Sequence, residues 1–394
     1  MSVFRKVLLG AVLLLAVGVA VLLQVPDWVD ARMNSLIHRP PYPASAEGSA
    51  LHNTLWVADL HDDALLWNRD ILQRYDRGHT DVPRLLDGHV ALQVFATVTK
   101  TPKGLNYERN AADSDNITLL AMAQRWPHAT WNSLLERALY QSEKLHLAAQ
   151  QSQSRLTTVR TREDLTASIR DWSQDHQHLA AILVTEGLHP LEGKLDNVDR
   201  LFDAGFRMAG LTHFFDNEVG GSAHGLEKGG LTPFGRQVVQ RLEARHMLID
   251  LAHASRPLIN DVLAMARRPV LVSHTGVEGT CPGPRNLTDD HLQRIAATGG
   301  VVGIGYWEGA VCDASLAGVV KAIRYAVGKV GVAHVALGSD FDGATRMPFD
   351  ATGLPALTDA LLKAGFSIGD VRAIMGGNVQ RLLFQSLPSI RSVE

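Results

Sequence analysis

The sequence lacks the features by which a nucleic-acid-binding protein is recognised. Its 394 residues carry 38 lysines and arginines against 41 aspartates and glutamates, so the net charge is −3 and there is no basic field to attract a polyanion. No glycine-rich phosphate fingerprint follows the first predicted strand, which disfavours an open, doubly wound nucleotide-binding sheet. We therefore expect a small-molecule or peptide ligand and no nucleic acid.

Cysteine is also scarce, since Cys281 and Cys312 are the only two. In an exported chain an even pair of this kind can form one disulfide, and two free thiols are the alternative. The spacing alone does not decide between them.

Long apolar runs are absent except for one at the start of the chain. Val7–Leu23 is unbroken, and Arg5 and Lys6 precede it. Its 17 residues are at the short limit for a membrane-spanning helix, and no clear cleavage site follows, so an uncleaved anchor is favoured over a removed signal peptide. The preceding positive charges predict a cytoplasmic N-terminus and a folded body on the periplasmic or extracellular side.

The remaining chain contains eight short apolar or β-branched runs, most of them separated by segments with a helical pattern. This alternation predicts an α/β fold, namely a TIM-like (β/α)8 barrel, for which a chain of this length is sufficient. The expected strands are Leu55–Leu60, Val90–Val98, Ala180–Val184, Arg207–Leu211, His246–Leu251, Pro269–Val272, Gly300–Gly305 and Val335–Gly338. The expected helices are Leu134–Ala149, Arg162–Trp172, Leu195–Ala204, Pro233–Ala244, Pro257–Ala266, Asp289–Ala297 and Ala314–Val330.

Polar residues of the kinds that bind metals or transfer protons follow six of these eight strands. They are His61 with Asp63, Glu186, His213, His253, His274, and Asp340 with Asp342. Any one of them alone could be a buried histidine or a loop carboxylate without function. Because the strand ends of a barrel meet on one face, their joint occurrence predicts a metal centre there, and imidazole and carboxylate ligands suit zinc. Other histidines, among them His52 and His79, lie in polar or helical surroundings, for which solvated roles suffice.

At these residues the sequence resembles the membrane (renal-type) dipeptidase family of the metal-dependent amidohydrolase superfamily. The resemblance extends from about Leu51 to Leu383 in the order of the family. Its motifs are Asp-Leu-His-Asp-Asp (59–63), Thr-Glu-Gly-Leu-His (185–189), Leu-Thr-His (211–213), Ile-Asp-Leu-Ala-His-Ala-Ser (249–255), Val-Ser-His-Thr (272–275), Arg-Asn-Leu-Thr-Asp-Asp (285–290) and Gly-Ser-Asp-Phe-Asp-Gly (338–343).

The resemblance implies two zinc ions per chain. His61 and Asp63 match the ligands of one ion. His253 and His274 match the ligands of the other, and Glu186 matches a carboxylate that bridges the two. A water shared by the ions would supply hydroxide at neutral pH and attack a peptide carbonyl.

The resemblance also implies roles for three further residues. Asp340 matches an acid–base aspartate that carries the proton from the water to the leaving amine. His213 matches a residue that contacts the oxyanion, and Arg285 matches one that holds the substrate carboxylate. The implied activity is the hydrolysis of dipeptides.

Several supporting features follow from the same resemblance. Asp59, Asp250 and Asp342 are expected to orient ligand imidazoles, with loop hydrogen bonding as the alternative. The family places a disulfide in the segments that contain Cys281 and Cys312. The oligomeric state stays open, with a homodimer as one candidate.

The expected organisation is a signal anchor at residues 1–25, a linker at 26–50, a catalytic barrel at 51–386 and a tail at 387–394. Two other functions remain open: a related amidohydrolase that acts on β-lactams or N-acyl amino acids, and a membrane-anchored envelope protein that only binds. The segment at 305–309 aligns poorly with an aromatic substrate contact of the family, so the side-chain preference of the substrate is also open.

Overall fold

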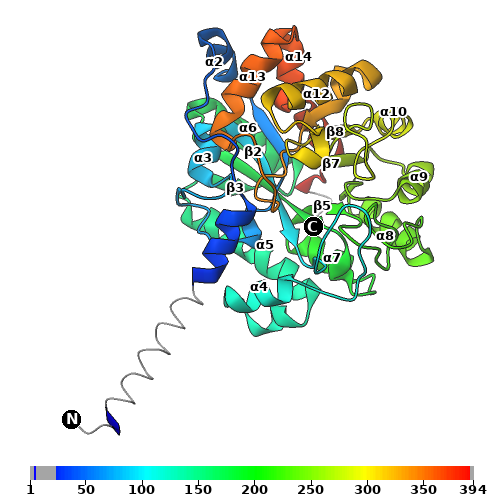
Figure 1. The fold of residues 1–394 in the computed structure, drawn as a ribbon. Helices are drawn as coiled ribbons and strands as arrows, with labels where there is room; N and C mark the ends of the chain where they lie inside the picture. Colours follow the sequence, from blue (N-terminus) through cyan, green and yellow to red (C-terminus); the bar gives the residue numbers. More distant parts are fainter. Residues whose placement is uncertain (1–3, 6–23, 391–394) are drawn as a thin grey trace.

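The computed structural model describes residues 4, 5 and 24–390, and its centre is a parallel β-barrel (Figure 1). Hydrogen bonds join the strands in the order β2-β1-β9-β8-β7-β6-β5-β4, and pairing of β2 with β4 closes the ring. A short additional strand, β3, pairs with the start of β4. The strands are β1 (Val57–Asp62), β2 (Val90–Val98), β3 (Leu156–Thr158), β4 (Leu179–Glu186), β5 (Phe206–Gly210), β6 (Leu248–Asp250), β7 (Leu271–Thr275), β8 (Val301–Ile304) and β9 (Val335–Leu337).

Helices surround this barrel, so the predicted TIM-like (β/α)8 fold is confirmed (Figure 1). All seven expected helices are present, with ends shifted by a few residues at most. The helices are α2 (Ala46–His52), α3 (Val82–Asp87), α4 (Ile117–Ala123), α5 (Leu134–Gln151), α6 (Arg162–Asp175), α7 (Asn197–Asp203), α8 (Pro233–Ala244), α9 (Arg256–Met265), α10 (Asp289–Ala297), α11 (Glu308–Val311), α12 (Leu316–Val330), α13 (Leu354–Lys363), α14 (Ile368–Arg372) and α15 (Asn378–Ser386).

Local sequence explains where many of these helices begin. Helices α8, α9, α10 and α12 each follow a serine or threonine whose side chain accepts a hydrogen bond from a backbone N–H group of the first turn. The strands read as nearly continuous apolar runs because both of their faces are covered, one by helices and one by the barrel interior. Sequence and structure therefore agree at the level of single elements.

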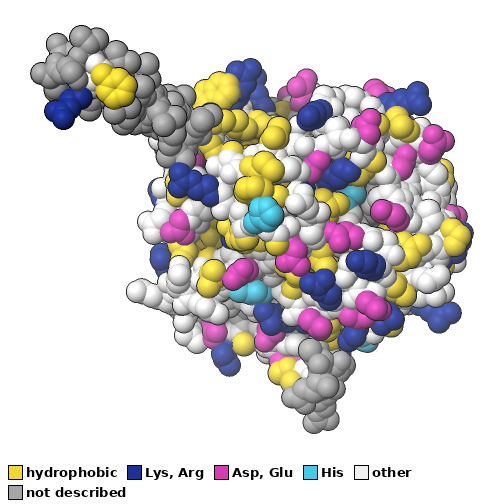
Figure 2. Space-filling view, turned by 90° about the horizontal axis from the view of Figure 1, so that it is seen from below, with side chains coloured by type: hydrophobic (Ala, Val, Ile, Leu, Met, Phe, Trp, Pro, Cys, Tyr) yellow, Lys and Arg dark blue, Asp and Glu magenta, His cyan; other side chains and the backbone are white. Residues whose placement is uncertain are grey.

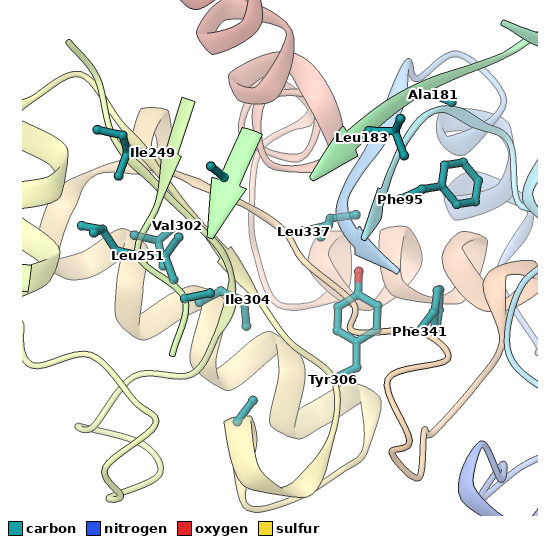
Figure 3. Close-up of a cluster of buried hydrophobic side chains, with 14 of the residues drawn as sticks. Phe95, Ala181, Leu183, Ile249, Leu251, Val302, Ile304, Tyr306, Leu337 and Phe341 are labelled. Carbon is teal, nitrogen blue, oxygen red and sulfur yellow. The ribbon is translucent and has the colours of Figure 1, made fainter. Parts of the chain in front are cut away.

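Two layers of apolar side chains hold the barrel together. The smaller cluster takes residues from all eight barrel strands and therefore fills the interior, where Leu382 and Leu383 of α15 also pack. The larger cluster lies between strands and helices, and Figure 3 shows part of it, including Phe95, Leu183 and Ile304. With the interior packed in this way, the site is confined to the ends of the strands.

The segment expected to be a linker contains ordered structure. Residues 24–33 form a helix, called here the 24–33 helix, and α2 follows within the same segment. Asp30 on the 24–33 helix is buried and forms ion pairs with Arg69 (2.9 Å) and Arg77 (3.1 Å). Ser45, the N-cap of α2, donates a hydrogen bond of 2.6 Å to Asp359. Both helices are therefore held against the barrel.

None of the helices in the described part of the chain is long and apolar enough to cross a bilayer. The predicted anchor, Val7–Leu23, lies outside the described residues. The membrane-spanning segment therefore stays a prediction.

Two histidines that the sequence placed among solvated residues are instead completely buried. His52 Nε2 donates to the carbonyl oxygen of Gly88 (3.0 Å), and its Nδ1 contacts the Thr358 hydroxyl (2.7 Å). His79 Nδ1 accepts the backbone N–H of Asp342 (2.9 Å). Both rings are buried despite their polar sequence context because the interior provides hydrogen-bond partners for them.

We expect these two histidines to make the stability of the protein depend on pH. Burial lowers the pKa of His52 and of His79 to about 4, whereas both titrate near 6.5 in the unfolded chain. Their contribution is therefore complete above pH 6.5 and is lost as the pH falls toward 4. Each pKa difference corresponds to roughly 3 kcal/mol of unfolding free energy.

Urea unfolding at pH 7, 6, 5 and 4 in the presence of a chelator measures this loss without interference from metal release. His52→Asn should reduce the loss of unfolding free energy between pH 7 and pH 4 by about 3 kcal/mol. His38→Asn, at an exposed position, should remove none. An unfolding free energy that is flat between pH 7 and pH 4 would contradict the assignment.

Candidate metal centre

The polar residues singled out in the sequence meet at the carboxyl end of the barrel. Glu186 is the last residue of β4, and His61 and His274 lie in the last two residues of β1 and β7. His253 and Asp340 follow β6 and β9 by three residues, and both have a left-handed backbone, with φ of 60° and 62°. Such conformations are uncommon outside glycine and are typical of functional sites.

Glu186 is at the centre of the group. Its Oε1 atom lies 3.5 Å from His61 Nε2, 3.2 Å from His253 Nε2 and 3.5 Å from His274 Nε2. Its Oε2 atom lies 3.4 Å from His213 Nε2. One carboxylate therefore contacts imidazoles that come from four different strands.

Two further short distances join pairs of these candidate ligand atoms. His61 Nε2 is 3.7 Å from Asp63 Oδ1, and His253 Nε2 is 3.0 Å from His274 Nε2. Two nitrogens on one tetrahedral zinc ion would lie about 3.3 Å apart. Asp340 joins the group, since its carboxylate and potential ligand atoms of His61 and Asp63 all lie within 4.8 Å of one another. The structure thus brings together every metal ligand that the sequence suggested.

Unpaired atoms in this group support a metal site. His61 Nε2 and Asp63 Oδ1 are buried and have no hydrogen-bond partner in the structure. A buried polar atom without a partner is costly, and a metal ion would satisfy both atoms. The donor set of neutral imidazole nitrogens and carboxylate oxygens therefore fits a divalent cation such as zinc.

The electrostatics of the group agree with this fit. Burial lowers the pKa of His253 and of His274 well below the usual value, which leaves both imidazoles in the neutral form that binds metals. Burial would also lower the pKa of His61, but the charges of Glu186 and Asp63 raise it well above the usual value. A positive charge is therefore stabilised between His61, Asp63 and Glu186.

The two carboxyl groups beside Glu186 are buried acids. Burial, together with the charge of Glu186, raises the pKa of Asp63 to about 7. Burial raises the pKa of Asp340 well above the usual value, although the nearby His61 acts in the opposite direction. An excess of buried carboxyl groups is a further reason to expect cations here.

Ser273 contacts two of these imidazoles, although no role was predicted for it from its motif, Val-Ser-His-Thr (272–275). Ser273 Oγ lies 2.9 Å from His274 Nδ1 and 3.4 Å from His61 Nδ1, so one hydroxyl is close to the outer nitrogens of two ligand rings. Ser273 precedes His274 directly in β7, which is the one signal that the sequence offered.

The three aspartates expected to orient these imidazoles have other partners. Asp59 accepts hydrogen bonds from the backbone N–H groups of His61 and Ser339, and Asp250 accepts those of Ala252 and Ser273. These contacts match the alternative of loop hydrogen bonding.

Asp342 forms an ion pair with Arg69 at 2.6 Å and accepts the backbone N–H of His79. The expectation that Asp342 orients a metal ligand was therefore wrong. Its short side chain reaches a buried arginine that comes from the β1 loop.

Arg285 lies beside the candidate metal ligands and is buried. Its Nη2 donates to the backbone oxygen of His274, and its guanidinium lies 5.5 Å from the ring centre of Trp307. Trp307 Nε1 in turn donates to Tyr107 Oη at 2.8 Å. The Nε atom of Arg285 has no partner, so this cation can still donate to a ligand. Tyr107 was not predicted because it follows no recognisable motif, and Trp307 lies in the segment 305–309, which aligned poorly with the aromatic substrate contact of the family.

A disulfide between Cys281 and Cys312 confirms the pairing that the resemblance implied. It links the loop after β7, which carries Arg285, to the residue that follows α11. Asn286 strengthens the same link, because its side-chain amide donates to the backbone oxygens of Cys281 and Ala310. The position of Arg285 is thus fixed from both sides.

A cavity of about 630 Å³ opens onto this centre. The charged and imidazole side chains in its lining all belong to the centre, and they are Asp63, Glu186, His213, His253, Arg285 and Asp340. The other lining residues come from the segments after β1, β2, β5, β8 and β9 and from the 24–33 helix, and they are mostly apolar.

A closed parallel barrel with imidazoles and carboxylates gathered at its carboxyl end is an architecture of metal-dependent hydrolases, and it is consistent with the amidohydrolase superfamily. Comparison with known families agrees. The chain belongs to the membrane dipeptidase family of peptide hydrolases (Peptidase family M19), whose model matches residues 45–387.

Individual relatives support this membership. Dipeptidase aclJ of Aspergillus oryzae is 35% identical over 231 residues, which cover 55% of this chain and 55% of the relative. The match therefore spans about half of the length of that relative. An uncharacterized dipeptidase of Schizosaccharomyces pombe is 27% identical over 343 residues, 84% of this chain and 78% of the relative.

Solved structures are similar in fold. The crystal structure of the metallopeptidase dipeptidase AC, of family M19, has a TM-score of 0.69 and 25% identity over 85% of this chain and 100% of its own. A metallopeptidase from Rhodobacter sphaeroides, solved with a phosphinate mimic of L-Ala-D-Ala, has a TM-score of 0.68 and 24% identity over 84% of this chain and 99% of its own. At that identity the second structure shows the fold alone.

Ser273→Ala is expected to weaken metal binding without unfolding the protein. Loss of a hydrogen bond to the outer nitrogen of a ligand imidazole lowers metal affinity by about 10- to 100-fold. Zinc affinity, measured by competition with a chromophoric chelator, tests this. Thr185→Val is the control, because the Thr185 hydroxyl is buried beside Glu186 but has no hydrogen-bond partner. Equal affinities of the two variants would show that Ser273 does not orient the ligands.

Proposed function

We propose that the protein is a zinc-dependent dipeptidase with two Zn²⁺ ions per chain. His61 and Asp63 would hold one ion, His253 and His274 the other, and Glu186 would bridge them. The observation that carries this proposal is the position of Glu186 Oε1, which lies between 3.2 and 3.5 Å from the Nε2 atoms of three histidines.

The ions, when bound, supply a water with a pKa near neutrality and polarise the peptide carbonyl. The other steps belong to side chains. Asp340 lies close enough to His61 and Asp63 to take the proton of the attacking water and to pass it to the leaving amine. His213 is buried, and its burial lowers its pKa, so a neutral imidazole can donate to the developing oxyanion.

Arg285 would hold the carboxylate of the substrate. Its Nε atom is buried without a partner, and a guanidinium binds a carboxylate with two parallel hydrogen bonds. The disulfide and Asn286 fix the loop that carries it. The distance between the carboxylate and the scissile bond would then restrict the substrate to dipeptides and related short amides.

A second candidate is the hydrolysis of N-acyl amino acids. Such a substrate has the same carboxylate and the same scissile amide, but no free α-amine. The mostly apolar lining of the cavity favours it, because an acyl chain can be buried there.

We further propose that the chain is anchored in a membrane by Val7–Leu23, with the catalytic barrel on the periplasmic or extracellular side. Arg5 and Lys6 before the run support this orientation. The disulfide between Cys281 and Cys312 agrees with an oxidising compartment.

Removal of metal tests the proposed centre. Dialysis against a zinc chelator should abolish the hydrolysis of alanyl dipeptides, with the C-terminal alanine in either configuration, and two equivalents of Zn²⁺ should restore it. Glu186→Gln should retain fewer than two tightly bound ions and lower kcat by at least about 1,000-fold, since it removes the negative charge of the bridging carboxylate. Glu227→Gln, at an exposed position, is the control. Full activity of the metal-free protein would refute the proposal.

A substrate panel tests the role of Arg285. Arg285→Met should raise KM for Ala-Ala by about 10- to 100-fold, because a charge-assisted pair contributes roughly 1.5–3 kcal/mol. Ala-Ala amide, which lacks the carboxylate, should be a poor substrate of the wild type and should not be affected by the substitution. Arg236→Met, half exposed at the surface, controls for the loss of charge. If both substrates respond equally, Arg285 does not bind the carboxylate.

A further inference from the structure

The cavity extends well beyond the metal centre. Its volume of about 630 Å³ is typical of sites for drug-sized ligands and exceeds the need of a dipeptide of small residues. The part away from the centre is called here the apolar channel. It is lined by Val29, Met33, Leu105, Ile117, Leu119 and Leu120.

One wall of the apolar channel is the 24–33 helix, and another is α4. Figure 2 shows hydrophobic side chains gathered on the face seen from below in Figure 1, the side on which these two helices lie. Leu119 is 61% exposed and Met33 is 44% exposed, so the outer end of the channel presents apolar surface to its surroundings. Exposed apolar surface that lines a cavity is typical of a binding site for an apolar group.

The 24–33 helix is a firmly attached wall. Asp30 pairs with Arg69, and Arg69 pairs with Asp342, two residues after Asp340. Asn34, next to the helix, accepts the backbone N–H of Ala344 at 2.9 Å. The helix is therefore fixed to the loop that carries Asp340.

This wall lies outside the part of the chain that the family model matches, which begins at residue 45. Membership of the family therefore does not account for it. The opposite wall, formed by Leu105 and α4, lies within the matched part of the chain.

The barrel order gives the direction in which a substrate would lie. Arg285 follows β7, whereas Leu105 and α4 follow β2, and β7 and β2 are opposite one another in the eight-stranded ring. A substrate with its carboxylate at Arg285 and its scissile carbonyl at Glu186 therefore points its amino-terminal side across the barrel mouth. That side reaches the apolar channel.

We propose that the apolar channel is a subsite for a long apolar chain on the amino-terminal side of the scissile amide. This inference rests on the proposed function, because it uses Arg285 as the carboxylate site. Two sources have the same chemistry: the side chain of the first residue of a dipeptide, and the acyl chain of an N-acyl amino acid. The two kinds of substrate differ only in the α-amine, which the dipeptide has and the N-acyl amino acid lacks.

Two matched substrate series test the proposal. One series is 2-aminobutanoyl-, 2-aminohexanoyl- and 2-aminodecanoyl-alanine, and the other is butanoyl-, hexanoyl- and decanoyl-alanine. The full chain is used in lipid nanodiscs, which avoids detergent chains in the assay. In at least one series we expect kcat/KM to rise by roughly two- to fourfold per added methylene, as expected from the transfer of a methylene out of water. The series that rises identifies the source of the chain.

Two substitutions on α4 form a matched pair. Leu119 and Met122 are both exposed, but only Leu119 lines the cavity. Leu119→Asp should abolish the gain in kcat/KM with chain length. Met122→Asp should keep the gain. Flat or falling kcat/KM in both series, or equal effects of the two substitutions on the ten-carbon substrates, would overturn the proposal.

A binding measurement separates this inference from the proposed function. Binding of decanoyl-alanine and butanoyl-alanine to the metal-free protein is measured by calorimetry, with the same two variants. Tighter binding of the longer ligand, lost in Leu119→Asp alone, supports the channel even if no substrate is cleaved. Absence of hydrolysis in the zinc-loaded protein would refute the dipeptidase proposal, whereas binding that is independent of chain length would refute the channel.

Discussion

The pairing of β2 with β4 is the constraint on which the rest of the structure depends. Seven consecutive residues of each strand are in register, from Leu92 opposite Ala180 to Val98 opposite Glu186. This pairing closes the ring and places Glu186 at its carboxyl end. Because the other strands are then fixed around the ring, their terminal side chains converge on one carboxylate. Local motifs supply these side chains, and barrel closure brings them together into one candidate metal centre.

Buried charges connect this centre to the beginning of the folded chain. Arg69, from the β1 loop, lies between Asp30 on the 24–33 helix and Asp342 in the β9 loop. Breaking one such pair would leave an uncompensated buried charge, which is costly. The network therefore holds the helix, and with it one wall of the cavity, in a constant position relative to Asp340. The 24–33 helix, most of which was predicted to belong to a linker, is therefore part of the site.

Much of the fold could be predicted because local signals and tertiary requirements coincide. The run Val90–Val98 is a strand with the predicted ends, and Pro233–Ala244 and Asp289–Ala297 are helices with the predicted ends. Prediction failed where a partner is distant in sequence. Asp342 binds Arg69, and His79 is enclosed by the β9 loop, although both had been placed in other surroundings. No pattern within a few residues reports contacts that span more than 250 positions.

The sequence by itself determined the type of fold and the kinds of side chains at the carboxyl end of the barrel. Strand periodicity and the residues after each strand are local properties of the sequence. Tertiary structure decided which atoms meet. It put Ser273 between the outer nitrogens of two imidazoles, Tyr107 against Trp307, and the 24–33 helix across from α4. These contacts depend on the register and closure of the barrel, which bring together loops from different strands. The residues of the candidate centre could therefore be identified from the sequence, whereas the shape of the cavity beside them is defined only by the fold.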